Sequence, residues 1–166
     1  MTSTDAPRPP SGRKFILGSD HAGYELKEKI RQYLLEAGNE VEDLQREFRP
    51  RIDFPPVAER VGRAVAADPA ACGILVCGTG LGVAMAANKV EGIRAAVLYS
   101  DAAAEYARRH NDANVLTFGG RTMGFEEARR RLEVFFGHQF EGSRYAERNE
   151  YIARMERGDQ CCADEG

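Results

Sequence analysis

The sequence predicts an α/β protein with a parallel sheet covered by helices on both faces. Short apolar runs alternate along the chain with stretches whose apolar residues recur at helical spacing. Glycines and polar residues follow several of the short runs, as at the carboxyl ends of parallel strands. Parallel neighbours need crossover helices, and these helices bury the sheet. We therefore expect a three-layer, doubly wound, Rossmann-like sheet of about five parallel strands, with an extra C-terminal helix.

The first predicted unit is a strand followed by a helix. Residues 14–18 form a short apolar run that ends in glycine, which is typical of a buried parallel strand. Residues 24–37 carry apolar side chains at helical spacing, and Gly38 is suited to end that helix.

The same alternation continues to residue 136. Further strands are expected at 40–44, 73–77, 94–99 and 114–118, and further helices at 57–67, 81–89, 102–110 and 125–136. Two segments lie outside this pattern: the polar loop 45–53 and a final helix at 144–157. The final helix carries so many charges that we expect it to pack on a partner subunit or to lie across a site.

Length and composition favour one domain. A chain of 166 residues can bury one substantial core, so we predict a single domain at 14–157, with a disordered leader at 1–13 and a disordered tail at 158–166. The net charge of −3 gives no bulk attraction to nucleic acid. No apolar stretch is long enough to span a membrane, so we expect a cytoplasmic location without nucleic-acid or membrane partners.

The four cysteines do not indicate a disulfide framework or a metal site. Cys161 and Cys162 are adjacent in a polar tail, which is unfavourable for an ordinary structural bridge. The spacing provides neither a Cys-x-x-Cys pair nor a His-x-x-x-His pair. We expect no metal.

A carboxylate and an imidazole stand side by side after the first predicted strand. Asp20 and His21 lie in a Gly-Ser-Asp-His-Ala-Gly segment just before a helix. In this fold class ligands bind beyond the carboxyl ends of the strands, so both side chains are candidates for chemistry. Asp20 could equally cap the helix, and His21 could be an ordinary surface histidine.

The most informative motif is a glycine-rich turn after the third predicted strand. Gly78, Gly80 and Gly82 alternate with Thr79 and Leu81, so the backbone can turn sharply and direct its amides at one point. Such a turn, followed by a helix, suits a phosphate or a developing enolate oxygen.

Cys77 begins this turn. Val83, which follows it, distinguishes the turn from the known nucleotide-binding motifs. A thiol beside the turn can act as a base or nucleophile, but a small buried residue at a strand end is an equal alternative. A dinucleotide fingerprint needs glycine where Val83 stands, and no P-loop Gly-Lys-Ser/Thr follows.

Two further groups of polar residues lie later in the chain. His110 and Asn111 belong to an Arg-His-Asn-Asp-Ala-Asn segment that precedes the last predicted strand. Arg121 follows two glycines, and Arg144 and Arg148 are four residues apart on one helical face. Guanidinium groups match phosphate oxygens, although each arginine alone could be a solvated surface charge.

Taken together, the motifs resemble the ribose-5-phosphate isomerase B family. They are Gly18-Ser-Asp-His-Ala-Gly23, Asp53-Phe-Pro55, Cys77-Gly-Thr-Gly-Leu-Gly82, Ala86-Ala-Asn-Lys89, Gly92-Ile-Arg-Ala95 and His110-Asn-Asp-Ala-Asn114. The resemblance extends from about residue 14 to residue 155. It implies an aldose-ketose isomerase that interconverts ribose 5-phosphate and ribulose 5-phosphate, without a cofactor. It also implies a doubly wound homodimer whose active sites are shared between subunits.

The resemblance also implies a role for each candidate residue. Cys77 corresponds to the base that moves a proton between C1 and C2 through an enediolate, and Thr79 and the amides of Gly78, Gly80 and Gly82 correspond to the groups that stabilise the charged oxygen. His110, with Asp20 nearby, corresponds to the ring-opening group. The phosphate-binding positions correspond to His21, Arg121, Arg144 and Arg148, and Asn111 to a contact with a substrate hydroxyl.

Three departures from the family pattern leave the substrate open. Phe54 stands where tyrosine is usual, Tyr145 stands where histidine often follows the first phosphate-binding arginine, and the loop 45–52 is unusual. One alternative is an isomerase of another phosphorylated aldose, such as a hexose or tetrose phosphate. A second is a module that binds a phosphorylated metabolite without catalysis, and a third is a redox role for Cys77, although no resolving cysteine is close in sequence.

Overall fold

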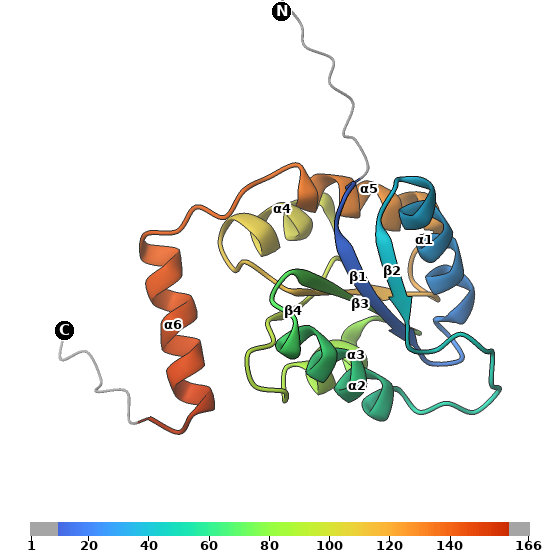
Figure 1. Ribbon diagram of the computed structural model, residues 1–166, viewed down its shortest axis with the longest axis horizontal. Helices are drawn as coiled ribbons and strands as arrows, with labels where there is room; N and C mark the ends of the chain where they lie inside the picture. The colour runs from blue at the N-terminus through green and yellow to red at the C-terminus, as the bar shows by residue number, and fades with distance from the viewer. Residues whose placement is uncertain (1–9, 160–166) are drawn as a thin grey trace, which may run out of the picture.

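The computed structural model describes residues 10–159, and it confirms the predicted α/β fold (Figure 1). Five parallel strands form one sheet in the order β2-β1-β3-β5-β4. The strands are β1 (Lys14–Ser19), β2 (Glu40–Asp43), β3 (Ala71–Cys77), β4 (Ala95–Val97) and β5 (Val115–Gly119). The helices are α1 (Tyr24–Glu36), α2 (Phe54–Ala67), α3 (Leu81–Ala87), α4 (Asp101–Arg109), α5 (Phe125–Phe136) and α6 (Arg144–Glu156).

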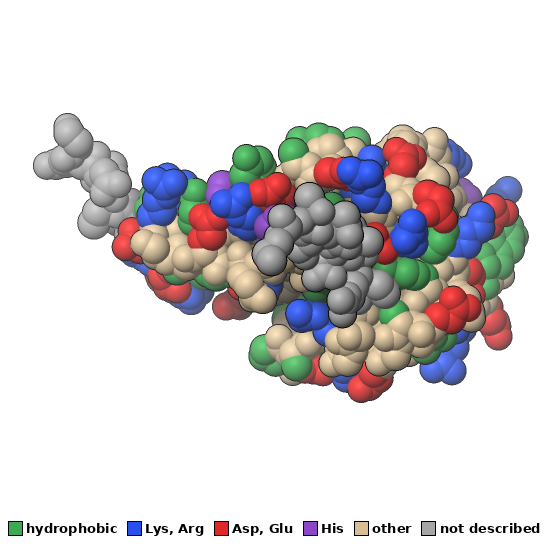
Figure 2. Space-filling view, turned by 90° about the horizontal axis from the view of Figure 1, so that it is seen from above, with side chains coloured by type: hydrophobic (Ala, Val, Ile, Leu, Met, Phe, Trp, Pro, Cys, Tyr) green, Lys and Arg blue, Asp and Glu red, His purple; other side chains and the backbone are tan. Residues whose placement is uncertain are grey.

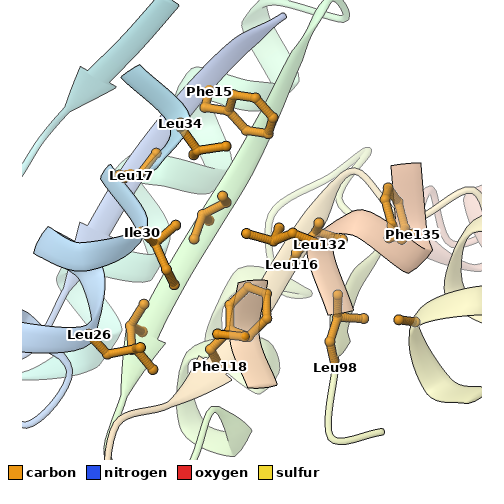
Figure 3. Close-up of a cluster of buried hydrophobic side chains, with 14 of the residues drawn as sticks. Phe15, Leu17, Leu26, Ile30, Leu34, Leu98, Leu116, Phe118, Leu132 and Phe135 are labelled. Atoms are coloured by element: carbon orange, nitrogen blue, oxygen red, sulfur yellow. The ribbon is translucent and has the colours of Figure 1, made fainter. Parts of the chain in front are cut away.

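Helices cover both faces of the sheet, as the alternation predicted (Figure 1). Helices α1, α4 and α5 pack on one face, where Phe15, Ile30, Phe118 and Leu132 are fully buried in one apolar cluster (Figure 3). Helices α2 and α3 pack on the other face around a second cluster. The central strands are therefore buried on both sides, which is why their apolar residues are consecutive in the sequence rather than alternating with polar residues.

Helix α2 begins earlier than the sequence pattern indicated. The predicted start was residue 57, whereas the helix begins at Phe54, with Pro55 and Pro56 in its first turn. The first amides of a helix have no intrahelical acceptor, so proline is tolerated there. The earlier start places Phe54 at the carboxyl edge of the sheet.

The chain changes direction between the neighbouring strands β1 and β3. The loop after β1 leads to α1 on one face, whereas the loop after β3 leads to α3 on the other. Such a switch point opens a crevice at the carboxyl ends of the strands, where ligands bind in this class of fold.

The loops around this crevice approach so closely that glycine is required. A Cβ atom on Gly23 would lie 2.3 Å from the carbonyl oxygen of Val76, and one on Gly120 would lie 2.5 Å from that of Ala22. Side chains cannot occupy such distances from backbone atoms, so these glycines allow the loops after β1, β3 and β5 to touch.

Helix α6 stands apart from the three layers (Figure 1). Hydrogen bonds connect α6 to the rest of the chain. Glu156 Oε2, at the end of α6, accepts from the amide of Gly92 (3.0 Å), and Asn149 Nδ2, in its middle, donates to the carbonyl of Asn111 (3.0 Å). Ile152 and Met155 remain 42% and 61% exposed, so α6 keeps an apolar surface outside the core. In the part of the chain described, no helix is long and apolar enough to cross a membrane.

The division into a single domain with disordered ends stays a prediction. Residues 1–9 and 160–166, with Cys161 and Cys162, lie outside the described residues.

We predict that Gly23→Ala destabilises the protein by ~1–3 kcal/mol, because the new methyl group must displace the backbone of β3. Urea unfolding measures the change. Gly124→Ala is the matched control: it has a φ of −87°, and its new Cβ would lie 3.9 Å from the nearest atom. Equal stability of the two variants would contradict the close approach of the loops.

Candidate active site

The loops after β1, β3 and β5 meet in one hydrogen-bonded group at the carboxyl edge of the sheet. Cys77 and Gly119 are register partners, and the amide of Gly120 donates to the carbonyl of Cys77 (2.8 Å). The amide of Arg121 donates to the carbonyl of Gly78 (2.9 Å), and that of Asp20 to the carbonyl of Val76 (3.2 Å). These bonds hold the backbone at this edge in one arrangement.

The glycine turn folds back over the sulfur of Cys77. Gly80 has a φ of +80°, and its amide donates to Cys77 Sγ (3.1 Å). The Cys77 side chain is nearly buried, and Thr79 Oγ1 accepts from the amide of Leu81 (3.3 Å). The left-handed conformation at Gly80 directs amides inward, which suits the stabilisation of negative charge near the sulfur.

Asp20 and His21 lie at the end of β1, beside this turn. Asp20 is buried, and its Oδ1 accepts from the amide of Gly23 (2.9 Å), so the carboxylate does organise the start of α1. His21 is exposed, and its Nδ1 lies 3.3 Å from the carbonyl oxygen of Ile52. A carbonyl only accepts, so a hydrogen bond here requires the proton on Nδ1.

Arg121 and Phe54 cover the glycine turn from two sides. A Cβ on Gly78 would lie 3.4 Å from Cδ of Arg121, and one on Gly82 would lie 2.9 Å from the ring of Phe54. Among the described residues Arg121 has no carboxylate partner, so its guanidinium group is available to an anion.

A second cluster gathers His110, Arg144 and Arg148 around Tyr145. The rings of His110 and Tyr145 are stacked, with centroids 4.0 Å apart and planes 9° apart. Arg144 Nη2 donates to the Tyr145 hydroxyl (2.9 Å), and Arg148 lies over the Tyr145 ring at 5.5 Å. Glu141 Oε2 is 3.8 Å from His110 Nε2. Helix α6 thus presents two guanidinium groups beside an imidazole.

Within one chain the structure does not bring His110 to Cys77. Strands β3 and β5 are parallel, with Cys77 beside Gly119 at the carboxyl end and Gly73 beside Val115 at the amino end. Helix α4 runs back from the carboxyl end, and His110 follows its last residue, five positions before Val115. The predicted residues therefore form two groups, and Asn111 belongs to the second with His110.

No group of three or more His, Cys, Asp or Glu side chains in residues 10–159 is arranged to hold a metal ion. Charged side chains of both signs are interspersed on the face seen in Figure 2, rather than gathered in a single basic patch.

Comparison with known proteins identifies the family to which this chain belongs. A model of the Ribose/Galactose Isomerase family matches residues 15–152, which is most of the chain. This chain belongs to the ribose/galactose isomerase family.

Its relatives in this family are similar along nearly their whole length. The chain is 43% identical over 144 residues to ribose-5-phosphate isomerase B of Escherichia coli, covering 87% of this chain and 97% of that protein. It is 36% identical over 149 residues to ribose-5-phosphate isomerase B of Mycobacterium tuberculosis, covering 89% and 92% respectively.

Solved structures agree with this assignment. Ribose-5-phosphate isomerase B from Mycoplasma genitalium, with bound ribulose-5-phosphate, matches with a TM-score of 0.84 at 37% identity, covering 89% of this chain and 99% of that one. The Clostridium thermocellum ribose-5-phosphate isomerase B matches with a TM-score of 0.84 at 40% identity, covering 87% and 98%.

Sequence reasoning missed one residue that shapes the site of this ribose/galactose isomerase. Thr117 is fully buried in β5, and its Oγ1 donates to the carbonyl of Gly80 (2.9 Å). The hydroxyl thus holds the turn that covers Cys77. A polar residue inside the apolar run Val-Leu-Thr-Phe-Gly was the available signal, because a buried hydroxyl needs a partner.

We predict that Thr117→Val destabilises the protein by ~0.5–1.5 kcal/mol, because the carbonyl of Gly80 loses one of its two donors and keeps only the amide of Ala84. Turnover also falls, since the turn is no longer held over Cys77. Urea unfolding and steady-state kinetics measure the two effects. Thr117→Ser keeps the hydroxyl and serves as control, and a Val variant as active as the Ser variant would contradict the role of this bond.

Proposed function

We propose that this ribose/galactose isomerase interconverts ribose 5-phosphate and ribulose 5-phosphate. The observation that carries the proposal is the position of Cys77, whose sulfur faces the amide of Gly80 in a glycine turn at the switch point of the sheet. The relatives named ribose-5-phosphate isomerase B, and the related structure with bound ribulose-5-phosphate, support the choice of substrate.

The proposed reaction is a proton transfer between two carbons of the open-chain sugar. Cys77, as the thiolate, removes the C2 proton of the aldose, and the electron pair forms an enediolate. The amides of Gly78, Gly80 and Gly82, with Thr79, stabilise the developing oxyanion. The proton on O2 passes to O1, and return of the abstracted proton to C1 then gives the ketose, so nothing is oxidised or reduced overall.

We propose that each site is completed by a second copy of the chain. His110, for ring opening, and Arg144 and Arg148, for the phosphate, are grouped away from Cys77 in the same chain. A homodimer would join the two groups across subunits. Asp20 then lies near the ring-opening histidine, and Asn111, beside His110, contacts a substrate hydroxyl.

Exposed apolar side chains support an interface beside the open edge of β4. Leu81 and Met85 of α3 are 54% and 68% exposed, and Tyr99 and Tyr106, just after β4 and in α4, are 71% and 48% exposed. Strand β4 has an unpaired edge, because it is the last strand of the sheet. Exposed apolar patches and open sheet edges are typical sites of subunit association.

The phosphate is proposed to bind between the two groups. Arg121 has no carboxylate partner among the residues the structure describes and lies over Gly78, and the preceding Gly120 touches Ala22, which follows His21. Arg144 and Arg148 would approach from the other subunit on α6. Several guanidinium forks around one phosphate give strong, charge-assisted hydrogen bonds. We propose a cytoplasmic location as well, since a charged sugar phosphate does not cross membranes freely.

We predict that Cys77→Ala lowers kcat on ribose 5-phosphate by about 10²–10⁴-fold, the usual contribution of a general base. Binding of ribulose 5-phosphate, measured by calorimetry, is retained. Cys72→Ala is the control: burial raises the pKa of the Cys72 thiol to about 12, so this thiol stays protonated at neutral pH and takes no part. Binding without turnover in the unmodified protein would instead favour a non-catalytic binding module.

A second candidate substrate is another phosphorylated aldose. The observation that favours this alternative is the ring of Phe54, which lies against Gly82 of the glycine turn. Phenylalanine offers no hydroxyl to the sugar. The ratio kcat/KM for tetrose, pentose and hexose phosphates, measured with the unmodified protein and with Phe54→Tyr, decides between the substrates. A higher kcat/KM for ribose 5-phosphate than for every other sugar supports the leading proposal.

We predict that mixing two inactive variants restores activity. In a heterodimer of Cys77→Ala and His110→Ala chains, one site carries both substitutions and the other carries neither. A random mixture of equal amounts should therefore regain about one quarter of the unmodified activity, given a closed two-fold dimer. The variants are mixed, unfolded, refolded together and assayed. No recovery, with refolded unmodified protein active, would contradict shared sites.

A further inference from the structure

A cavity lined by arginines lies at the carboxyl end of β2, outside the residues assigned above. Its volume is about 560 Å³, and the loop 44–53 and the start of α2 form its walls. Arg46, Arg49, Arg51 and Arg60 all line it. This is the same edge of the sheet as Cys77, because all the strands are parallel.

The loop that carries these arginines is anchored from beneath by a buried lysine. Lys27 is fully buried, and its Nζ donates to Asp43 Oδ2 and to the carbonyl of Gln45, each at 2.5 Å. Asp43 Oδ1 in turn accepts from the amide of Gln45 (2.8 Å). A buried lysine needs such partners, so this contact fixes the beginning of the loop.

The middle of the loop is held against α1. The Tyr24 hydroxyl donates to the carbonyl of Arg46 (3.0 Å), and the rings of Tyr24 and Phe48 meet edge to face at 5.4 Å. The arginines therefore project from an organised loop rather than from an unattached run of surface charge.

The guanidinium groups of this loop lack ionic partners among the described residues. Arg46, Arg49 and Arg51 have no carboxylate within ion-pairing distance, whereas Arg129, Arg130 and Arg131 of α5 are all paired. The cavity also contains Glu47 and Asp53, and its third carboxylate, Asp43, is already neutralised by Lys27. With Asp43 paired to the buried Lys27, four arginines line the cavity beside two other carboxylates, Glu47 and Asp53, which favours an anionic occupant.

A contact between Ile52 and His21 joins this cavity to the proposed phosphate position. Ile52 lines the cavity, and its carbonyl oxygen faces Nδ1 of His21 (3.3 Å). Strand β1, which carries His21 beyond its end, lies between β2 and β3. Neighbouring strands are about 4.8 Å apart, so the end of β2 is roughly 10 Å from the end of β3. One extended ligand can span that distance.

We propose that the arginine-lined cavity is an anion subsite for a second phosphoryl group, attached beyond the one held near His21. The ligand class is a sugar diphosphate ester, in which a ribose-like unit faces Cys77 and the outer phosphoryl group enters the cavity. The inference rests on the proposed function, because that function places the first phosphate near His21. The outer phosphate provides an anionic partner for Arg46, Arg49 and Arg51, which have no carboxylate partner among the described residues.

Calorimetry with two unreactive open-chain probes, ribitol 5-phosphate and ribitol 5-diphosphate, tests this proposal. The unmodified protein should bind the diphosphate about tenfold more tightly or better, the effect of one or two added charge-assisted hydrogen bonds. In the double variant Arg49→Gln/Arg51→Gln that advantage should disappear, while affinity for the monophosphate and turnover of ribose 5-phosphate stay unchanged. Arg63→Gln is the control, since Arg63 pairs with Glu59 outside the cavity.

The outcomes separate this proposal from the proposed function. Equal affinities for the two probes, an advantage that persists in the double variant, or diphosphate binding that does not compete with the monophosphate would each overturn the subsite alone. Failure to bind either probe, together with no turnover of ribose 5-phosphate, would overturn both proposals.

Discussion

Backbone contact among the loops after β1, β3 and β5 is the constraint on which the site depends. Gly23 and Gly120 allow backbone atoms to approach where any side chain would collide with a carbonyl oxygen. The contact fixes the glycine turn, in which the amide of Gly80 donates to Cys77 Sγ. Preorganised donors of this kind are the main source of electrostatic stabilisation in enzymes. The surrounding sheet and both apolar clusters keep the three loops in register.

The chemistry of the chain is divided between two regions. The carboxyl edge of the sheet provides a thiol and an oxyanion turn, whereas the region of α6 provides an imidazole and two guanidinium groups around Tyr145. Neither region alone meets the needs of an isomerase that opens a ring, transfers a proton and holds a phosphate. The detached position of α6 and the exposed apolar side chains near β4 are consistent with an assembly in which the regions meet.

The sequence predicted the order and type of the elements from residue 14 to residue 156, most directly in β1, β3 and β5, where a nearly buried apolar run contains or is followed by glycine. It also placed Cys77 and Asp20 at strand ends. The motifs alone did not show that His110 lies at the opposite end of the sheet from Cys77, although the predicted parallel sheet implies it, because each crossover helix runs back from the carboxyl edge. Nor did helical periodicity reveal Lys27, which lies on the buried face of α1 and is satisfied by Asp43, the carbonyl of Gln45 and the neighbouring Glu28.

The most direct measurement is a crystal structure of the assembled protein with ribulose 5-phosphate. C1 and C2 of the sugar should lie about 3–3.5 Å from Cys77 Sγ of one chain, a distance suited to proton transfer. Arg144 and Arg148 of a second chain should contact the phosphate. A sugar bound wholly by one chain, or a phosphate remote from both α6 arginines, would contradict active sites shared between chains.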